Sequence, residues 1–190
     1  MMEISEQELI HLAKKGDRFA QAKIVKDHEK MVYNLGLKLL GDAEKAECVL
    51  QETFLKVLQA LPKFEEKSQL STWIYRIATN QALMRLRSQK RRYVSLDEDA
   101  EDNGKDYSVF VKSLEADPLD KLLNQELKEK MDHAIEQLPE NYKTVFVMKD
   151  IEGLALKEIA EVLDLSLPAV KSNLHRARIS LRNKLADMWN

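Results

Sequence analysis

The stretch that decides the fold runs from Leu156 to Arg182 and reads LKEIAEVLDLSLPAVKSNLHRARISLR. Its apolar residues recur at helical spacing on both sides of a short polar break around Asp164. From Val170 onward they step by four, three, four and four residues to Leu185, which gives one continuous helical stripe. This pattern predicts two helices joined by a tight turn, the helix-turn-helix arrangement.

The second of these helices carries only positive charge. No Asp or Glu occurs between Leu165 and Ala186. A DNA recognition helix needs an apolar underside held by its own domain and a cationic face for phosphates and base edges. The alternative, a solvated amphipathic helix, usually mixes Glu with Lys, so the pattern favours a helix that lies in the major groove. The polar face comprises Lys171, Ser172, Asn173, Arg176, Arg178, Arg182 and Lys184.

The turn between the two helices is expected at Asp164. Gly is usual at such a turn because the backbone tends to be left-handed there. Asp tolerates this conformation better than most residues, at a cost of ~1 kcal/mol. We therefore expect a positive φ at Asp164 without loss of the motif.

Charge divides the chain into three parts. Residues 1–95 carry 17 Lys/Arg and 12 Asp/Glu, residues 96–124 carry 3 and 9, and residues 125–190 carry 10 and 11. The acidic middle, which begins LDEDAEDNGKD at Leu96, has no helical period and predicts a flexible linker. The expected fold class is all-α, with two small helical domains at 1–92 and 119–190 joined by an acidic linker at 93–118.

Helical periodicity and breaker residues define eight expected helices and no strand. Gly16-Asp17 and Gly41-Asp42 separate the first three, each Asp serving as an N-cap. Ser68 or Ser71 is expected to open the fourth, and Ser166 the last. The helices are expected near 5–15, 17–40, 43–61, 70–91, 119–137, 140–150, 156–163 and 167–186.

Composition excludes several classes of protein. The single cysteine, Cys48, rules out an internal disulfide and a Cys-based zinc site, and the four histidines are too far apart for metal ligands. We therefore expect neither a metal nor another cofactor. No run approaches the ~18 apolar residues that span a bilayer, and no signal peptide is visible. A cytoplasmic protein without membrane insertion of its own is expected.

The expected helix near 70–91 has an apolar stripe beside a mixed aromatic and cationic one. Leu70, Ile74, Ile77 and Met84 form the expected buried stripe, and Trp73, Arg76, Asn80 and Arg87 form its neighbour. Cations at a helix C-terminus are favourable through the dipole alone, but five in eight residues favour phosphate binding. Trp73 is either core or a platform for an unpaired base. The five cations are Arg85, Arg87, Lys90, Arg91 and Arg92.

The expected helix near 43–61 carries two apolar stripes. One fits the core of its own domain, and the second indicates either a docking surface for a partner helix or a central helix of a bundle. Catalysis by Glu47 and Glu52 is disfavoured, because no His, Lys or nucleophile is placed to complete a site. The first stripe comprises Leu50, Phe54, Val57 and Leu61, and the second Glu44, Cys48, Gln51, Leu55 and Leu58.

Two blocks of sequence resemble a known family. The runs GDAEKAECVLQETFLKVLQALPKF and STWIYRIATNQALMRLR resemble region 2 of the sigma-70 superfamily, and LPENYKTVFVMKDIEGLALKEIAEVLDLSLPAVKSNLHRARISLRNKL resembles region 4. With only an acidic linker between them, the layout is similar to the extracytoplasmic-function (ECF, group IV) RNA polymerase sigma factors. The resemblance spans nearly the whole chain.

The resemblance implies a promoter-recognition subunit, not an enzyme, that directs RNA polymerase to the −35 and −10 elements and opens the DNA. Its partners would be promoter DNA, the β′ coiled coil and β flap of core polymerase, and an anti-sigma factor. The residues implied in polymerase docking are Glu47, Cys48, Gln51, Glu52, Leu55 and Leu58. Those implied in −10 recognition and melting are Phe64, Ser68, Trp73, Arg76, Asn80, Arg85, Arg87, Arg91 and Arg92, with a flipped base held by the loop from Phe64 to Leu70. Those implied in −35 recognition are Pro168, Lys171, Ser172, Asn173, His175, Arg176 and Arg178.

The sequence departs from the family pattern at a few positions. Cys48 stands where an acid is common, which weakens the polar part of the implied β′ contact, and Lys143 stands where Arg is usual. Met84 replaces a frequent Asp, Gln81 a frequent apolar residue, and Asp164 the turn Gly. Two other functions compete: a stand-alone helix-turn-helix regulator that binds DNA as a dimer, and a helical adaptor without DNA function.

Overall fold

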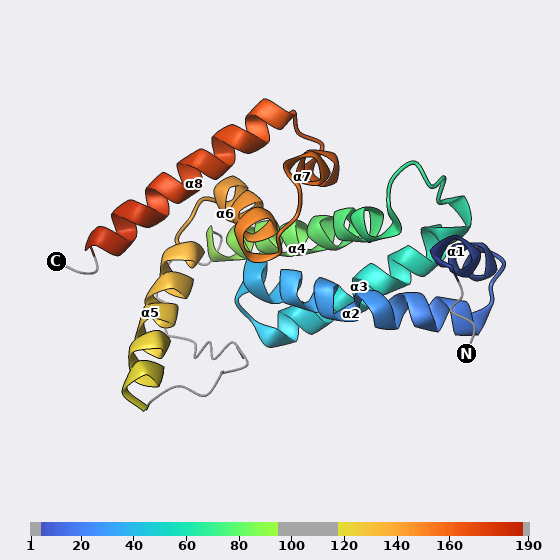
Figure 1. The fold of residues 1–190 in the computed structure, drawn as a ribbon, viewed down its shortest axis with the longest axis horizontal. Coiled ribbons are helices and arrows are strands. Elements are labelled where there is room, and N and C mark those ends of the chain that lie inside the picture. The colour runs from blue at the N-terminus through green and yellow to red at the C-terminus, as the bar shows by residue number, and fades with distance from the viewer. Residues whose placement is uncertain (1–4, 95–117, 188–190) are drawn as a thin grey trace. The chain divides into compact units, whose positions relative to one another are not determined.

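The computed structural model describes residues 5–94 and 118–187, and the side chains of residues 5–88, 126, 127 and 129–186. The interior of the acidic linker expected at 93–118 lies outside these residues. All regular structure in the described ranges is helical (Figure 1). The elements are α1 (Glu6–Lys14), α2 (Arg18–Leu40), α3 (Ala43–Ala60), the 3-10 turn η1 (Leu61–Lys63), α4 (Leu70–Val94), α5 (Pro118–Glu136), α6 (Glu140–Phe146), the π-helical turn η2 (Val147–Ile151), α7 (Leu156–Leu163) and α8 (Leu167–Asp187).

The chain forms two compact units. The first contains α1 to α4, and the second contains α5, α6, η2 and α8. Both were expected from the sequence as helical, and the described helices begin and end within a few residues of the expected bounds. No described helix is long and apolar enough to cross a membrane.

The first unit is built on the hairpin of α2 and α3, which lie side by side. Gly41 joins them in the left-handed conformation, with φ at 63°, and its N–H donates to the Leu37 carbonyl at 2.8 Å. The Asp42 carboxylate then accepts from the Lys45 N–H at 3.1 Å and caps α3, as expected. Further along the hairpin, a Cβ on Gly36 would lie 3.2 Å from the Cα of Ala46, so the two backbones approach closely there.

Buried aliphatic side chains from all four helices form the core of the first unit. Two expectations for α4 are wrong. Met84 is 60% exposed, because the buried side of this helix includes the small residues Ala78, Thr79 and Ala82, which the hydrophobic stripe passed over. The helix begins at Leu70, where the Gln69 carbonyl accepts from the Trp73 N–H, and not at a serine cap. The core includes Leu9, Ile24, Leu35, Val49, Val57, Leu61 and Ile74.

In the second unit, α5 and α6 pack on α8. The helix expected at 140–150 is α-helical only as far as Phe146, after which η2 continues it as a π-turn. Such single π-turns are uncommon and are frequent at functional sites. The buried residues include Ile135, Leu138, Val145, Met148, Val170, Leu174, Ala177 and Leu181.

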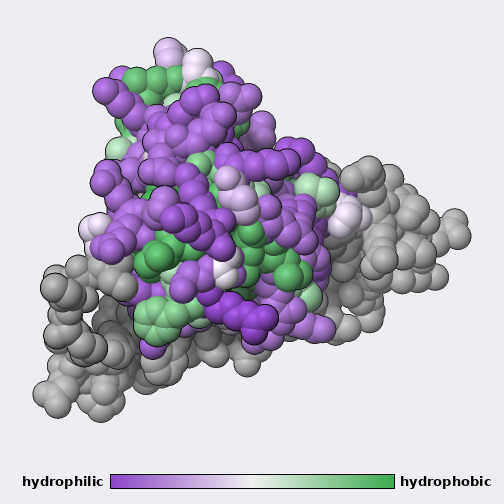
Figure 2. Space-filling model, turned by 90° about the vertical axis from the view of Figure 1, so that its right-hand side faces the viewer, coloured by the Kyte–Doolittle hydropathy of each residue, from purple (hydrophilic) through white to green (hydrophobic). Residues whose placement is uncertain are grey.

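Hydrophilic residues predominate on the face drawn in Figure 2, and apolar residues form separate patches on it. Single exposed apolar side chains are normal on a protein surface and need no explanation. The most exposed large apolar side chains among the described residues are Phe19, Leu55 and Met84, which lie on α2, α3 and α4 respectively.

Candidate nucleic-acid interface

The turn between α7 and α8 has the conformation that the sequence predicted. Asp164 has a positive φ of 52°. The Ser166 hydroxyl accepts from the Ala169 N–H at 3.4 Å, and the Ser166 carbonyl accepts from the Val170 N–H at 3.1 Å. At the other end of α7, the Glu158 carboxylate accepts from the Ala155 N–H at 2.7 Å, which satisfies a donor at the helix start. The two helices of the motif therefore begin at side-chain caps.

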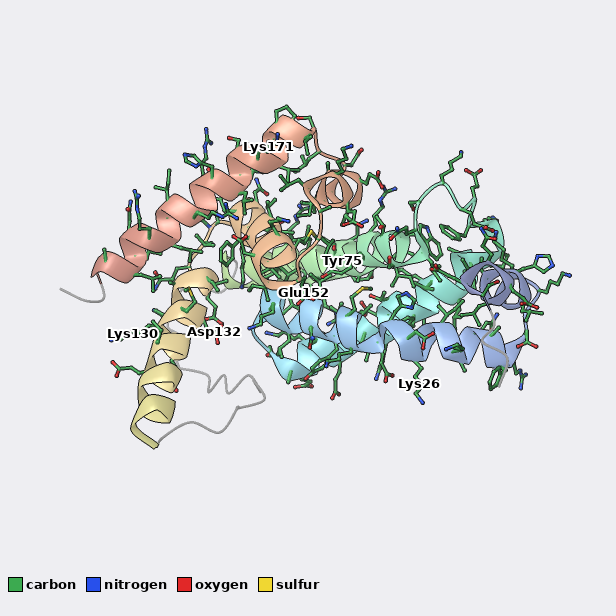
Figure 3. The ribbon with its side chains drawn as sticks, viewed as in Figure 1. Lys26, Tyr75, Lys130, Asp132, Glu152 and Lys171 are labelled. Carbon is green, nitrogen blue, oxygen red and sulfur yellow. The ribbon has the colours of Figure 1, made fainter. Side chains whose placement is uncertain are left out.

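Helix α8 separates an apolar side from a polar one. Val170, Leu174, Ala177 and Leu181 are buried. Lys171 is exposed in the first turns of the helix (Figure 3), and it forms no ion pair or hydrogen bond with the described part of the chain. The remaining residues expected at the −35 element are exposed as well, except Asn173, which is half-buried; they are Pro168, Ser172, His175, Arg176 and Arg178.

Two of the cations expected at the −35 element have partners within the second unit. Arg178 donates from Nη2 to Oδ1 of Asp150 at 2.6 Å and from Nε to Oδ2 at 2.9 Å. These hydrogen bonds raise the pKa of Arg178 further above its ordinary value. Arg176 donates from Nη1 to the hydroxyl of Tyr142 at 3.3 Å. Both contacts tie the recognition helix to the α6 and η2 segment, and sequence reasoning missed both.

In the first unit, Trp73 packs on Phe64. The ring centroids are 4.7 Å apart with the planes tilted by 32°. Phe64 is 6% exposed, whereas Trp73 is half-buried. Both earlier interpretations of Trp73 therefore stay open, because part of the indole is packed and part is accessible. Phe64 contributes to the core beneath the loop, and its expected role at a flipped base stays a prediction.

The described part of the basic side of α4 has three exposed polar residues and one arginine that forms an ion pair with α3. Arg76, Asn80 and Arg87 are exposed, and Ser68 in the preceding loop is half-buried. Arg85 donates from Nη2 to Oε1 of Glu52 at 2.6 Å, across to α3. This bond to Glu52 is the main cause that raises the pKa of Arg85, and neighbouring Cys48 adds to it. The side chains of Arg91 and Arg92 lie outside the described residues.

The second stripe of α3 faces outward. Leu55 is 61% exposed, and Glu47 and Gln51 are exposed beside it. Cys48, Glu52 and Leu58 are half-buried along the same side. The opposite side of the helix, with Val49, Phe54 and Val57, is buried in the core. Helix α3 thus presents a surface with apolar and acidic residues, and we call Glu47, Cys48, Gln51, Glu52, Leu55 and Leu58 the α3 stripe.

The described residues contain no group of three or more His, Cys, Asp or Glu side chains arranged to hold a metal ion. The exposed cations, exposed amides and partly accessible indole can contact nucleic acid, and the apolar and acidic α3 stripe can contact a protein.

Comparison with known proteins identifies the family. A model of sigma-70 region 2 matches residues 24–92, and a model of sigma-70 region 4 matches residues 128–181. The ECF RNA polymerase sigma factor SigW of Bacillus subtilis is 36% identical over 190 residues, which cover 98% of this chain and 100% of the relative. The ECF RNA polymerase sigma-E factor of Escherichia coli K12 is 31% identical over 187 residues, covering 98% of this chain and 97% of the relative.

Two solved structures share the fold. CnrH, in complex with the cytosolic domain of CnrY, has a TM-score of 0.64 at 22% identity and covers 94% of this chain and 96% of its own. RpoE of Bartonella quintana, in complex with the anti-sigma factor NepR, has a TM-score of 0.68 at 18% identity and covers 87% and 96%. At these identities the likeness concerns the fold alone.

The chain belongs to the sigma-70 family, in its ECF group of RNA polymerase sigma factors. Regions 2 and 4 together define a transcription initiation factor that recognises promoters with RNA polymerase. The function expected from the sequence is thereby confirmed at this level.

Proposed function

We propose a division of labour between the two units. The α3 stripe docks on the β′ coiled coil of core polymerase, α4 with the preceding loop recognises and opens the −10 element, and α7 with α8 reads the −35 element while the surrounding surface touches the β flap. The protein works by binding and not by catalysis, in the cytoplasm where RNA polymerase acts. The acidic linker, in this proposal, runs toward the active-site and RNA-exit channels.

The exposed α3 stripe carries this proposal, because a stand-alone DNA-binding regulator does not need it. Leu55 projects from a helix whose other side is already buried, so it is free for a partner. Glu47 and Gln51 flank it with polar groups suited to a basic or amide-bearing helix. The Glu52 carboxylate and the Cys48 thiol are less available to a partner, because both interact with Arg85. We therefore assign the apolar part of the stripe most of the binding energy.

The experiment that tests the docking surface is the affinity of full-length protein for core polymerase. Leu55→Ala is expected to weaken it by about tenfold, a usual cost of truncating a central interface residue. Phe19→Ala is the matched control, because Phe19 is a similarly exposed apolar residue, 73% exposed, that belongs to α2 and not to the α3 stripe. Equal affinities for the two variants would remove the α3 stripe from the interface.

For the −35 element, Lys171 is the cation best placed to meet DNA. It is exposed and free, whereas Arg178 and Arg176 already have partners on η2 and α6. We therefore propose that Lys171, Ser172 and His175 contact phosphates or base edges directly. Arg176, held by a single longer hydrogen bond, can exchange Tyr142 for DNA. Arg178 acts mainly on the position of the helix.

For the −10 element, the exposed Arg76, Asn80 and Arg87 supply phosphate and base-edge contacts beside Trp73. Opening a duplex costs a few kcal/mol per flipped base, about what pocket and stacking contacts return. A half-buried indole has enough free surface for such a contact. Arg85 is less available than the sequence suggested, because Glu52 holds it.

The competing function is a helix-turn-helix regulator that binds duplex DNA as a dimer. It predicts specific footprinting by the isolated protein, whereas a sigma factor is expected to give promoter-directed initiation only with core polymerase. In vitro initiation from a genomic library with core enzyme separates the two and also reads out the promoter sequence. A specific nanomolar footprint without polymerase would favour the regulator.

An anti-sigma factor is the remaining partner that we propose. One solved structure of the same fold is a complex with the anti-sigma factor NepR. A protein that covered the α3 stripe of this chain would block the proposed contact with polymerase, so competition between such a protein and core polymerase for wild-type chain is the expected behaviour.

A further inference from the structure

Helix α1 lies outside the segment that the region 2 model matches, which begins at residue 24. It nevertheless belongs to the first unit, where it packs on α2 and on η1. The turn η1 leads directly into the loop from Phe64 to Leu70, to which we assign −10 recognition. The C-terminal end of α1 therefore adjoins the start of that loop, and Lys14 is the residue at this end.

Lys14 contacts the loop in two ways. Its Nζ donates to Oε1 of Glu66 at 2.5 Å, and the same Nζ stands 5.7 Å from the centroid of the Phe64 ring. The Phe64 ring packs in turn on Trp73. Four side chains thus form one connected group, from α1 through the loop to α4: Lys14, Glu66, Phe64 and Trp73.

The backbone of Glu66, a member of this group of side chains, has an unfavourable conformation. Glu66 has a φ of 57°, in the left-handed region that side chains with a Cβ rarely adopt, and the loop keeps it there without a glycine. A residue persists in such a conformation only when its surroundings hold it. The ion pair with Lys14 holds the Glu66 side chain. Water screens this pair only in part, since the Lys14 side chain is 22% exposed and that of Glu66 is 45% exposed.

We propose that Lys14 is a positioning residue for −10 recognition. It holds Glu66 in its left-handed conformation and seats the Phe64 ring, and through Phe64 it sets the ring of Trp73. This inference rests on the proposed role of the loop and of Trp73 in contacting opened DNA. Lys14 itself touches no base; it acts on which base the loop accepts.

The first experiment measures base preference at each −10 position. Full-length variants with core polymerase initiate from a promoter library randomised over the −10 element. Lys14→Met keeps the length of the side chain but loses its charge, and it is expected to reduce discrimination in the −10 element about three- to fivefold, as a partly exposed ion pair with a cation–π contact allows. Discrimination at the −35 element and affinity for core polymerase should not change.

Two further variants separate the contacts. Lys14→Arg retains both the ion pair and the cation over the ring, so it should preserve discrimination. The double variant Lys14→Glu with Glu66→Lys restores only the ion pair, so it should recover part of what either single variant loses. The matched control is Lys26→Met, because Lys26 lies on α2 and points away from its helical neighbours (Figure 3). If Lys14→Met and Lys26→Met give the same −10 profile, or the exchanged pair recovers nothing, the proposal is wrong.

A second measurement does not depend on transcription. The chain has two tryptophans, and Trp189→Phe leaves Trp73 as the only one. In that background, Lys14→Met should increase the acrylamide quenching constant of Trp73 fluorescence about twofold, because Phe64 is no longer held against the indole ring. Unchanged quenching overturns the positioning role. A failure of wild-type protein to initiate at any promoter, with quenching altered as expected, would instead reject the proposed function and leave the contact intact.

Discussion

Arg178 of α8 and Asp150 of η2 are joined by two parallel hydrogen bonds, at 2.6 and 2.9 Å. Such a two-bond pair between a guanidinium and a carboxylate sets orientation as well as distance. The Asp150 side chain is 25% exposed, and it comes from the π-turn that ends the α6 segment. Arg178, on the exposed face of α8, is therefore bound by the protein itself, and we propose that these bonds fix the position of the helix.

We expect the Arg178–Asp150 pair to stabilise the second unit. In a double-mutant cycle, Asp150→Ala and Arg178→Ala should show a coupling of about 0.5–1 kcal/mol, since the pair is partly exposed to solvent. Hydrogen exchange of α8 amides is the measurement, because it reports on the second unit alone. Asp150→Ala should also not strengthen promoter binding. Tighter binding would mean that Arg178, once released, contacts DNA directly.

Lys171→Ala should weaken −35-dependent initiation and leave stability unchanged. A lysine that neutralises one phosphate contributes about 0.9 to the slope of log affinity against log salt concentration, and the variant should lose that much. Affinity for promoter DNA, measured with core polymerase over a range of salt, gives the slope. A promoter with a scrambled −35 element is the control, and an equal loss there would assign Lys171 to non-specific binding.

Trp73→Ala should impair promoter opening more than closed-complex formation. A stacked base is worth about 1–3 kcal/mol, so opening should fall roughly tenfold. A premelted promoter should restore initiation, because the step that needs the indole has then been supplied. Failure of the premelted promoter to rescue the variant would leave Trp73 with packing on Phe64 as its only role.

Lys143 makes the stability of the second unit depend on pH. Its side chain is buried, and burial lowers its pKa below the ordinary 10.5, with Glu136 offsetting part of the effect. The folded state therefore releases this proton before the unfolded state does as pH rises. Stability should increase with pH from the lowered pKa up to 10.5, while the cost of the buried charge is fully present at lower pH.

Lys143→Met removes this cost and should stabilise the second unit by about 1 kcal/mol near neutral pH. The advantage over wild type should be smaller at about pH 10 than at about pH 7.5, because the lowered pKa of Lys143 lets the folded wild type release this proton before the unfolded chain does. Hydrogen exchange of α6 amides at the two pH values gives the difference, corrected for the pH dependence of intrinsic exchange. An advantage that stays constant would show that Lys143 keeps its proton throughout.

Most of the fold could be predicted from the sequence because it depends on neighbours along the chain. The caps at Asp42 and Ser166 and the positive φ at Asp164 follow from side chains and turns within a few residues. The all-α class and its two helical parts follow from periodicity and charge. The exact limits of the domains, at 1–92 and 119–190, stay predictions, as do the roles of individual residues at DNA and polymerase.

The contacts that refine the site could not be predicted in this way. Asp150 and Arg178 are 28 residues apart in the chain, and Lys14 and Glu66 are 52 apart. No local pattern relates such residues. The prediction that Met84 is buried was wrong for a different reason. Its hydrophobicity favoured a core position, but the side of α4 that packs in the core carries small residues instead. Arg85, expected at DNA, forms an ion pair with Glu52 for the same long-range reason.

Helix α3 must both pack on α2 and present an exposed side to a partner, and the close approach of Gly36 to Ala46 assigns the packing to one side of the helix. Because α3 rests backbone to backbone on α2, a side chain larger than hydrogen at position 36 would have to displace Ala46. The rotation of α3 about its own axis is thus set by the contact between two buried residues, Gly36 and Ala46. The exposed residues Gln51 and Leu55 on the opposite side can then change without altering how α3 packs on α2. The contact with polymerase that we propose for α3 and the packing of the first unit can therefore change independently at these positions.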